Sequence, residues 1–394
     1  MQISLPATVR RHPVTTPGTG WRSPVSPFGC GQYNKTMRIM TCIEDLRRVA
    51  RRKVPRAFFD YAEAGSYAQE TLRANREDLE HIKLRQRVLV DVSQRDLTTT
   101  ILGERVSLPL ALAPIGLCGM MHGDGEILAC RAAQAVDKPF WFQLYVMKDR
   151  GFIRALIERA AAAKCSALVL TLDLQVLGQR HCDIRNGMTV PPQIKFGNLI
   201  DIAKKPAWAL SILRGRRKTF GNLAGHVQGM GNVNSLAQWT ANQFDPTLNW
   251  KDVEWVRSIW PGKLILKGIL DVEDARIAAK AGASALVVSN HGGRQLDGAL
   301  SSIAALPKVV EAVGDQIEVM FDGGIRSGQD VLRALARGAR SCMIGRSYIY
   351  GLGAGGEAGV ARAIEILGKE LDVTMALCGV RNVRDIDPRV IAQA

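Results

Sequence analysis

The sequence predicts an α/β protein, a (β/α)8 TIM-type barrel that lacks one strand–helix unit. From about residue 108 onward, short apolar runs alternate with helical patterns, which is typical of βαβ units and a parallel sheet. Polar residues follow nearly every predicted strand, at the end where such barrels carry their functional sites. Only seven strands can be placed, one fewer than a closed barrel needs.

Each element follows from its local pattern. Helical patterns precede the barrel at 43–52, 55–63 and 66–80. The predicted strands are 108–113, 141–146, 167–172, 264–269, 285–289, 318–321 and 341–345. Helical patterns lie between most of them, for example at 151–164, 272–281 and 329–337. The missing strand is the second one, because the helix at 124–136 runs through Asp137-Lys138-Pro139 almost directly into the strand at 141–146.

The composition is ordinary for a globular protein, with 47% hydrophobic and 23% charged residues among 394. No apolar run approaches the roughly 18 residues of a membrane span. The eight cysteines lack any Cys-x-x-Cys spacing, which argues against a disulfide framework or a metal site. The net charge of +15 is local, since residues 1–43 carry +5 and residues 187–244 carry +6. Without a recognised nucleic-acid module, this charge does not predict nucleic-acid binding.

Two segments stand apart from the barrel. Residues 1–40 are rich in Pro, Gly, Ser and Thr and predict a disordered N-terminal extension, for which a transit peptide and an over-long gene model are both open. Residues 41–394 form the barrel domain, which carries a basic insertion at 187–244. Within the insertion, Ile200–Phe220 mixes apolar and basic residues, a pattern that fits a membrane-surface segment or a lid over the site equally well.

The glycine pattern Gly351-x-Gly353-x-x-Gly356 matches the dinucleotide-binding fingerprint letter for letter. Its context does not, because only 38 residues follow and no strand–helix–strand unit is available to them. Glycines that precede a C-terminal helix are the preferred interpretation.

Two other glycine turns, Asp322–Gly328 and Ile344–Ser347, end the last two predicted strands. Backbone amides of such turns, together with Arg326 and Arg346, suit a phosphate group. Barrels commonly bind phosphate after their seventh and eighth strands, so the position of the turns strengthens the prediction.

Polar residues at the other strand ends predict a reactive site. The stretch Ser289–Asp297 follows a buried strand and brings His291 and Arg294 to its end, which suits a base beside a clamp for a carboxylate. Lys267 ends an apolar strand and is costly to bury unless it meets an anion or a cofactor. Tyr145 and Asp173 follow two further strands. Each residue alone has a structural interpretation, but together they converge on one rim of the barrel.

These residues resemble the family of FMN-dependent α-hydroxy-acid dehydrogenases and oxidases, and within it the bacterial membrane-associated L-lactate dehydrogenases, over roughly residues 41–391. The motifs that carry the resemblance are Phe59-Asp60-Tyr61, Ala113-Pro114-Ile115-Gly116, Phe142–Val146, Leu264–Gly268, Ser289–Asp297, Asp322–Arg326 and Ile344–Arg346. Asn242–Pro246 and Asn249–Asp252 favour the lactate dehydrogenase branch.

The resemblance implies roles for individual residues. His291 would accept a proton from a 2-hydroxy acid, and Asp173 would stabilise its protonated form. Tyr145 would contact the substrate hydroxyl. Arg180 and Arg294, with Tyr61, would hold the substrate carboxylate. Lys267 would stabilise negative charge at the flavin's pyrimidine edge. The remaining residues implied to bind FMN are Ala113, Gln143, Thr171 and Ser289 at the isoalloxazine ring, and Asp322, Gly324, Arg326, Gly345 and Arg346 at the phosphate and ribityl chain.

One departure from the family pattern coincides with the missing strand. Roughly twenty residues, about one strand and the start of its helix, are absent between Val136 and Asp137. The lost strand normally contacts the flavin, and its loss leaves an open sheet edge. Either the N-terminal tail or a shifted segment fills this gap, or the barrel is damaged. We expect FMN retention and activity to be weakened as a result.

The resemblance implies FMN-dependent oxidation of L-lactate to pyruvate, with electrons passed to a quinone or cytochrome. An oxidase, or a dehydrogenase of another 2-hydroxy acid such as mandelate or glycolate, is the related alternative. The alternative of another class is a catalytically impaired barrel remnant, because of the internal deletion. We also expect a cytoplasmic homo-oligomer in peripheral contact with the inner face of the cytoplasmic membrane through residues 200–220.

Overall fold

The computed structural model describes residues 3–4, 39–133, 140–189, 193, 195–216, 221–222 and 242–392. Several predicted segments therefore lie outside the described residues: most of the extension at 1–40, residues 134–139 at the end of the predicted helix 124–136, and residues 190–192, 194, 217–220 and 223–241 of the insertion. Within the described part, no helix combines the length and apolar character needed to cross a membrane.

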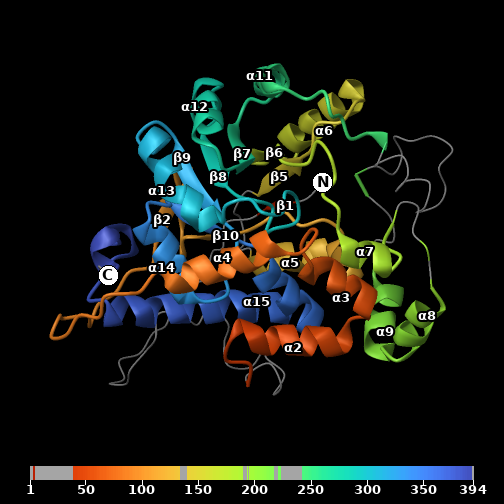
Figure 1. Cartoon of the computed structure of the whole chain (residues 1–394), viewed down its shortest axis with the longest axis horizontal. Coiled ribbons are helices and arrows are strands. Elements are labelled where there is room, and N and C mark those ends of the chain that lie inside the picture. Colours follow the sequence, from red (N-terminus) through yellow and green to blue (C-terminus); the bar gives the residue numbers. More distant parts are fainter. Residues whose placement is uncertain are drawn as a thin grey trace.

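A curled sheet forms the centre of the molecule, with strand order β1-β5-β6-β7-β8-β9-β10-β4 (Figure 1). Its strands are β1 (Ile3–Ser4), β4 (Leu110–Leu112), β5 (Trp141–Leu144), β6 (Ala167–Thr171), β7 (Lys263–Ile269), β8 (Ala285–Val288), β9 (Glu318–Asp322) and β10 (Ser341–Ile344). From β5 through β10 to β4 all neighbours pair in parallel. The described residues thus confirm the predicted barrel of seven parallel strands.

The sheet opens where the second barrel strand is predicted to be missing. Among the described strands, β4 pairs only with β10, and β5 has no parallel neighbour on its side away from β6. That free edge of β5 is covered by β1, which pairs antiparallel in the register Ile3↔Phe142 and Ser4↔Trp141. Of the possibilities left open by the sequence, the structure selects the N-terminal segment as the one that lies in the gap.

Helices alternate with the strands and cover the outside of the sheet (Figure 1). Before the barrel come α2 (Ile43–Lys53), α3 (Arg56–Glu63) and α4 (Glu70–His81), then the hairpin of β2 (Thr99–Ile101) and β3 (Glu104–Val106). The later helices are α5 (Gly125–Ala133), α6 (Arg150–Ala162), α7 (His181–Arg185), α8 (Phe196–Ala203), α9 (Pro206–Arg214), α11 (Trp250–Ile259), α12 (Val272–Lys280), α13 (Ser302–Val313), α14 (Gly328–Ala336) and α15 (Arg346–Leu377). Short 3-10 turns lie at Cys118–Met120, Val383–Asp385 and Pro388–Val390.

Local chemistry explains why many of these helices start where they do. The side chains of Asp149, Asn249, Asp271, Ser301 and Ser327 each accept a hydrogen bond from an amide in the first turn of the helix that follows. Such caps satisfy donors that the helix itself cannot, and each contributes about 1 kcal/mol. The helix starts are therefore encoded locally, independent of the barrel.

Alternating side chains along the strands divide the core in two. One cluster fills the inside of the barrel and includes Trp141, Val169, Ile265, Val287 and Met320, with Ile101 of the β2–β3 hairpin packed against them. The other lies between the outer face of the sheet and the helices. A filled interior leaves the rim at the carboxyl ends of the strands as the place for a site.

The glycines of the apparent dinucleotide fingerprint lie in α15. A Cβ atom on Gly351 would lie 2.3 Å from the carbonyl oxygen of Gly359, and one on Gly353 would lie 3.1 Å from Ala50 Cβ in α2. Gly355 and Gly356 form a kink with non-helical backbone angles. These glycines therefore allow close packing within α15 and against α2, and they lie inside this helix rather than ahead of it as predicted from the sequence.

The β1–β5 pairing generates a stability prediction. Successive amide groups of a strand point in opposite directions, so replacing both Ile3 and Ser4 with proline removes whichever donor faces β5. We expect the Ile3→Pro/Ser4→Pro variant to lose about 1–2 kcal/mol of unfolding free energy, measured by urea denaturation. The Ile3→Val/Ser4→Thr variant keeps the donors and is expected to match the parent. Equal stability of the proline variant and the parent would contradict a role for β1 in the sheet.

Candidate active site

A histidine and a carboxylate meet at the rim formed by the carboxyl ends of β6 and β8. His291 Nδ1 lies 2.9 Å from Asp173 Oδ1, although 118 positions separate the two in the sequence. His291 has a left-handed backbone conformation, with φ of 58°, and its amide donates to Ser289 Oγ at 3.1 Å. An aspartate at Nδ1 orients the imidazole ring and leaves Nε2 as the nitrogen that can exchange protons with a ligand.

Backbone without a side chain makes this contact possible. Gly268 lies one residue before the end of β7 with φ of 104°, and a Cβ atom there would lie 2.5 Å from Asp173 Cγ. Gln295 then ties the loop that carries Asp173 to the loop that carries His291, because its amide nitrogen donates to the carbonyl oxygens of Asp173 and Val176. The pair is thus held by both of its loops.

The pKa values of both members of the pair lie below their ordinary values, for different reasons. Burial lowers the pKa of His291 below its ordinary value of 6.5, and this outweighs the effect of Asp173, which raises it. For Asp173, burial would raise the pKa, but His291 and Lys267 bring it below its ordinary value. At neutral pH the imidazole is therefore neutral and able to accept a proton, next to an ionised carboxylate.

Two arginines adjoin this pair. Arg180 Nε donates to the carbonyl oxygen of Arg294 at 3.2 Å, and the Arg294 guanidinium lies over the Tyr61 ring at 4.8 Å from its centroid. Arg294 also lies 3.9 Å from the buried carboxylate of Asp183. Burial, followed by the charge of Arg294, lowers the pKa of Arg180. Two cations held this close in a buried place favour binding of an anion, and the guanidinium fork matches a carboxylate.

Lys267 lies at the centre of the rim as one member of a buried polar group. Its Nζ donates to Ser289 Oγ at 2.8 Å and lies 3.3 Å from Asp322 Oδ2, while Ser289 Oγ donates to Asp322 Oδ1 at 3.1 Å. Beside this group, Gln143 Nε2 donates to Thr171 Oγ1 at 3.1 Å. These contacts join the ends of β5 to β9 with polar atoms that are shielded from water.

The ends of β9 and β10 bring a second pair of arginines to the rim. Arg346 follows β10, and its four hydrogen bonds all go to main-chain carbonyl oxygens, those of Ala62, Glu63, Ala64 and Gly292. Burial lowers the pKa of Arg346 to about 10. Arg326 follows β9 and lies over the Tyr350 ring at 5.5 Å from its centroid.

A cavity of about 610 Å³ connects these groups. Of the residues predicted from the sequence, it is lined by Tyr61, Ala113, Tyr145, Arg180, Lys267, His291, Arg294, Asp322, Gly324, Arg326, Gly345 and Arg346. Asp173, Gln143, Thr171 and Ser289 lie immediately behind this lining and contact it or each other. The structure therefore brings all the predicted site residues to one rim.

The sequence matches a known protein family over most of its length. The family described as FMN-dependent dehydrogenase matches residues 50–140 and 133–393. The chain belongs to the FMN-dependent dehydrogenase family. The match is divided in two at 133–140, which is where the missing strand is predicted.

Relatives and solved structures agree with this assignment. An L-lactate dehydrogenase of Caulobacter vibrioides is 47% identical over 377 residues, covering 90% of this chain and 98% of that protein. An L-lactate dehydrogenase of Haemophilus influenzae is 42% identical over 375 residues, with 90% and 98% covered. Among solved structures, the monotopic membrane protein (S)-mandelate dehydrogenase is 31% identical with a TM-score of 0.85, covering 90% of this chain and all of that one.

The residues of this FMN-dependent dehydrogenase fit its cofactor on three observations. Gln143 Oε1 is buried and has no hydrogen-bond partner among the described residues, so it can accept from a ring N–H. Glycines 323, 324 and 345 line the cavity next to Arg326 and Arg346, as a phosphate site requires. Finally, the described lining carries five cations, Arg180, Lys267, Arg294, Arg326 and Arg346, against the two carboxylates of Asp183 and Asp322. Such an excess suits a phosphate together with a carboxylate.

Several residues that shape the site were missed by sequence reasoning. Asp183 lies in α7, three positions after the predicted Arg180, and Gln295 lies within the predicted stretch Ser289–Asp297, but neither was given a role. Phe244, from the insertion, lies with its ring 6.1 Å from that of Tyr145. Asn75 and Arg76 of α4 support two of the loops, and no local pattern in α4 indicates this.

Proposed function

We propose that this protein oxidises L-lactate to pyruvate with FMN as its cofactor. The observation that carries the proposal is the His291–Asp173 pair beside Arg180 and Arg294, on a cavity that also has a phosphate-type site. This combination supplies a base, a carboxylate clamp and a place for FMN within one space. Identity also favours lactate, because the relatives named L-lactate dehydrogenase are 42–47% identical, whereas the structures named mandelate dehydrogenase or oxidase are 31–35% identical.

Substrate binding is assigned to the first arginine pair. Arg180 and Arg294 would hold the carboxylate of lactate, and the Tyr61 ring keeps the Arg294 guanidinium in place through its cation–π contact. Burial raises the pKa of Tyr145, so its hydroxyl stays protonated and can donate to the substrate oxygen. Phe244 packs edge-on against the Tyr145 ring.

Proton transfer is assigned to His291. Because burial keeps its pKa low, the neutral ring can accept a proton from the 2-hydroxy acid at neutral pH. The resulting imidazolium is stabilised by the Asp173 carboxylate at 2.9 Å. FMN, when bound, accepts the two electrons that leave the substrate. Lactate would thereby lose two electrons and two protons and become pyruvate, with one proton taken by His291 and the other passing with the electrons to FMN.

Cofactor binding is assigned to the rest of the rim. Arg326, Arg346 and the glycine turns that precede them would hold the phosphate and ribityl chain. Gln143, Thr171, Ser289 and Ala113 would lie along the ring system, with Lys267 stabilising negative charge at its edge. The electron acceptor is proposed to be a membrane quinone or a cytochrome. Homo-oligomerisation stays a prediction from the family resemblance.

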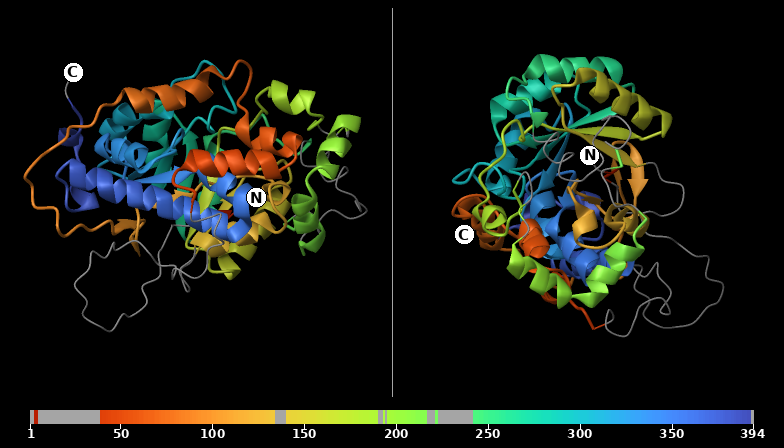
Figure 2. Two further views of the ribbon diagram at one scale, coloured as in Figure 1. Left: turned by 90° about the horizontal axis from the view of Figure 1, so that it is seen from below. Right: turned by 90° about the vertical axis from the view of Figure 1, so that its right-hand side faces the viewer.

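Membrane contact is proposed through α8 and α9, which lie at the end of the molecule opposite its C-terminus (Figures 1 and 2). Phe196 and Leu213 are 77% and 69% exposed, and Leu199, Ile200 and Leu210 are also exposed. Basic residues flank them at Lys195, Lys204, Lys205, Arg214 and Arg216. Trp208 lies within the segment predicted from the sequence, but it turns inward, where its indole N–H donates to the Met120 carbonyl oxygen and its ring stacks on Phe58.

The proposed function can be tested by the absorption spectrum of bound flavin. We expect the purified chain to show the absorption spectrum of bound flavin and to be bleached by L-lactate, but not by D-lactate, under anaerobic conditions. Subsequent addition of a quinone analogue is expected to restore the colour. A colourless protein that does not bind added FMN would favour the impaired barrel remnant. Bleaching without reoxidation by the quinone would contradict only the proposed acceptor.

The protonation states predict a pH dependence. As the pH falls through the lowered pKa of His291, the base becomes protonated, so kcat/KM should fall with a midpoint below 6.5. Replacing Asp173 with Asn removes a charge that raises this pKa. We therefore expect the midpoint to move to still lower pH, and the plateau rate to fall by about 10²-fold or more. A midpoint that moves to higher pH would show that Asp173 does not act on His291 in this way.

Membrane contact is tested by sedimentation with anionic lipid vesicles. Replacing Phe196 and Leu213 with Ser removes exposed apolar surface without touching the site, and should reduce the bound fraction several-fold at constant salt. Leu377→Ser removes an apolar side chain that is 55% exposed on α15, and should leave binding unchanged. Equal sedimentation of all three proteins would exclude α8 and α9 as the anchor.

A further inference from the structure

The turn between β9 and α14 carries the phosphate-type site, and helix α4 lies directly against its outer side. Gly323 and Gly324 adopt φ values of 121° and 90°, and a Cβ atom on Gly324 would lie 2.2 Å from the Asn75 carbonyl oxygen in α4. The other side of the turn lines the cavity, through Gly323, Gly324, Ile325 and Arg326. The position of α4 therefore bears on the shape of a surface that a ligand meets.

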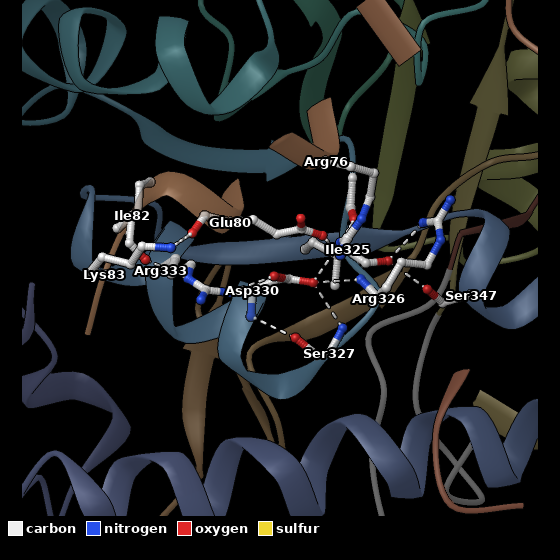
Figure 3. A network of polar contacts seen from close by, with 11 residues as sticks. Arg76, Glu80, Ile82, Lys83, Ile325, Arg326, Ser327, Asp330, Arg333 and Ser347 are labelled. Carbon is white, nitrogen blue, oxygen red and sulfur yellow. Dashed lines mark hydrogen bonds and ion pairs between the residues drawn. The ribbon is translucent and has the colours of Figure 1, made fainter. Parts of the chain in front are cut away.

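Asp330, near the start of α14, binds the second half of the β9–α14 turn, residues 326 and 327. Its Oδ2 accepts from the amides of Arg326 at 2.9 Å and Ser327 at 3.0 Å. The Asp330 side chain is only 1% exposed. Figure 3 shows it between Arg76, Arg333 and the main chain of Arg326 and Ser327. Burial would raise the pKa of Asp330, but the charge of Arg76 and the amide of Arg326 bring it below its ordinary value, so the carboxylate is ionised.

Arg76 of α4 holds both halves of the turn at once. Its Nη1 donates to Asp330 Oδ2 at 2.8 Å and also to the Gly324 carbonyl oxygen. Behind them, Ser347 Oγ donates to the Ile325 carbonyl oxygen at 2.6 Å. Main-chain groups at four successive positions, 324 to 327, are thus held by side chains. Together these contacts restrain the main chain of the turn that lines the cavity (Figure 3).

We propose that Arg76 and Asp330 are positioning residues for the cofactor phosphate. Arg76 and Asp330 hold the turn from Gly324 to Ser327 so that Arg326 and the backbone of the turn face the phosphate. Arg76 and Asp330 do not contact the phosphate. This inference rests on the proposed use of FMN. It assigns a function to α4, which precedes the barrel and contributes no residue to the cavity lining among the described residues.

Other residues of α4 bind the loop that carries His291, so a specific effect of Arg76 on the phosphate turn must be distinguished from support of the whole rim by α4. Asn75 exchanges hydrogen bonds of 2.8 Å with Asn290, in the loop that carries His291, and accepts from the Ser302 amide. The Thr71 amide likewise donates to Asp297 Oδ1 of the same loop at 2.9 Å. If α4 supported the rim only in general, losing Arg76 would disturb the flavin ring and the His291 loop as much as the phosphate.

The test compares FMN with riboflavin, which has the same ring system but no phosphate. Dissociation constants are measured by flavin fluorescence quenching on the full chain freed of its cofactor. For Arg76→Met we expect the dissociation constant of FMN to rise at least tenfold and that of riboflavin to change less than twofold. Asp330→Asn should behave in the same way. Arg76→Lys keeps the charge but loses the guanidinium fork, and should fall between Arg76→Met and the parent.

The matched control is Glu80→Gln. Glu80 pairs with Arg76 Nη2 at 2.8 Å, but it is 60% exposed and does not contact the turn, so both dissociation constants should stay unchanged. Parallel weakening of FMN and riboflavin in Arg76→Met and Arg76→Lys would overturn the proposal in favour of general support. Unchanged FMN affinity would also overturn it. A parent chain that binds neither flavin would instead show that the proposed function is wrong, and this inference with it.

Discussion

The parallel direction of seven neighbouring strands is the constraint on which the rest of this structure depends. Because every strand from β5 through β10 to β4 points the same way, residues that follow the strands are delivered to one rim. His291 and Asp173 meet there although 118 positions separate them. Along the strands themselves, apolar side chains point alternately to the inside of the barrel and to the helices. The polar residues lie at the strand ends and therefore do not disturb this core.

The same constraint makes the missing strand consequential. In a closed barrel each strand satisfies the edges of its two neighbours, and the loss of one exposes two edges. In this chain β1 covers the edge of β5, antiparallel and only two residues long. It cannot deliver side chains to the rim in the way a parallel strand does. The site is therefore built on the remaining strands and their loops, and α4 supports it from outside, because Asn75 and Arg76 bind the loops after β8 and β9.

The rim also carries an excess of positive charge. In each of its two arginine pairs one member has a lowered pKa, because burial lowers the pKa of Arg180 and of Arg346 and a neighbouring arginine adds to the effect. The hydrogen bonds of Arg346 all go to carbonyl oxygens. Such an arrangement costs stability unless an anion completes it. The spacing of the pairs, one beside His291 and one after β9 and β10, matches a substrate carboxylate and a cofactor phosphate. Burial of the same site keeps His291 neutral, so one environment serves both binding and proton transfer.

The sequence by itself determined the alternation of strands and helices, the missing second strand and the residues at the strand ends. These are local properties: apolar runs, capping residues such as Ser327, and polar residues that directly follow a strand. Only the tertiary structure decided that Ile3–Ser4 lies against β5, that Trp208 turns inward, and that Arg76 reaches Asp330 across 254 positions. Such contacts depend on how distant elements pack, and packing leaves no periodic signal in any one of them. For that reason the chemistry of the rim could be predicted, while the support beneath it could not.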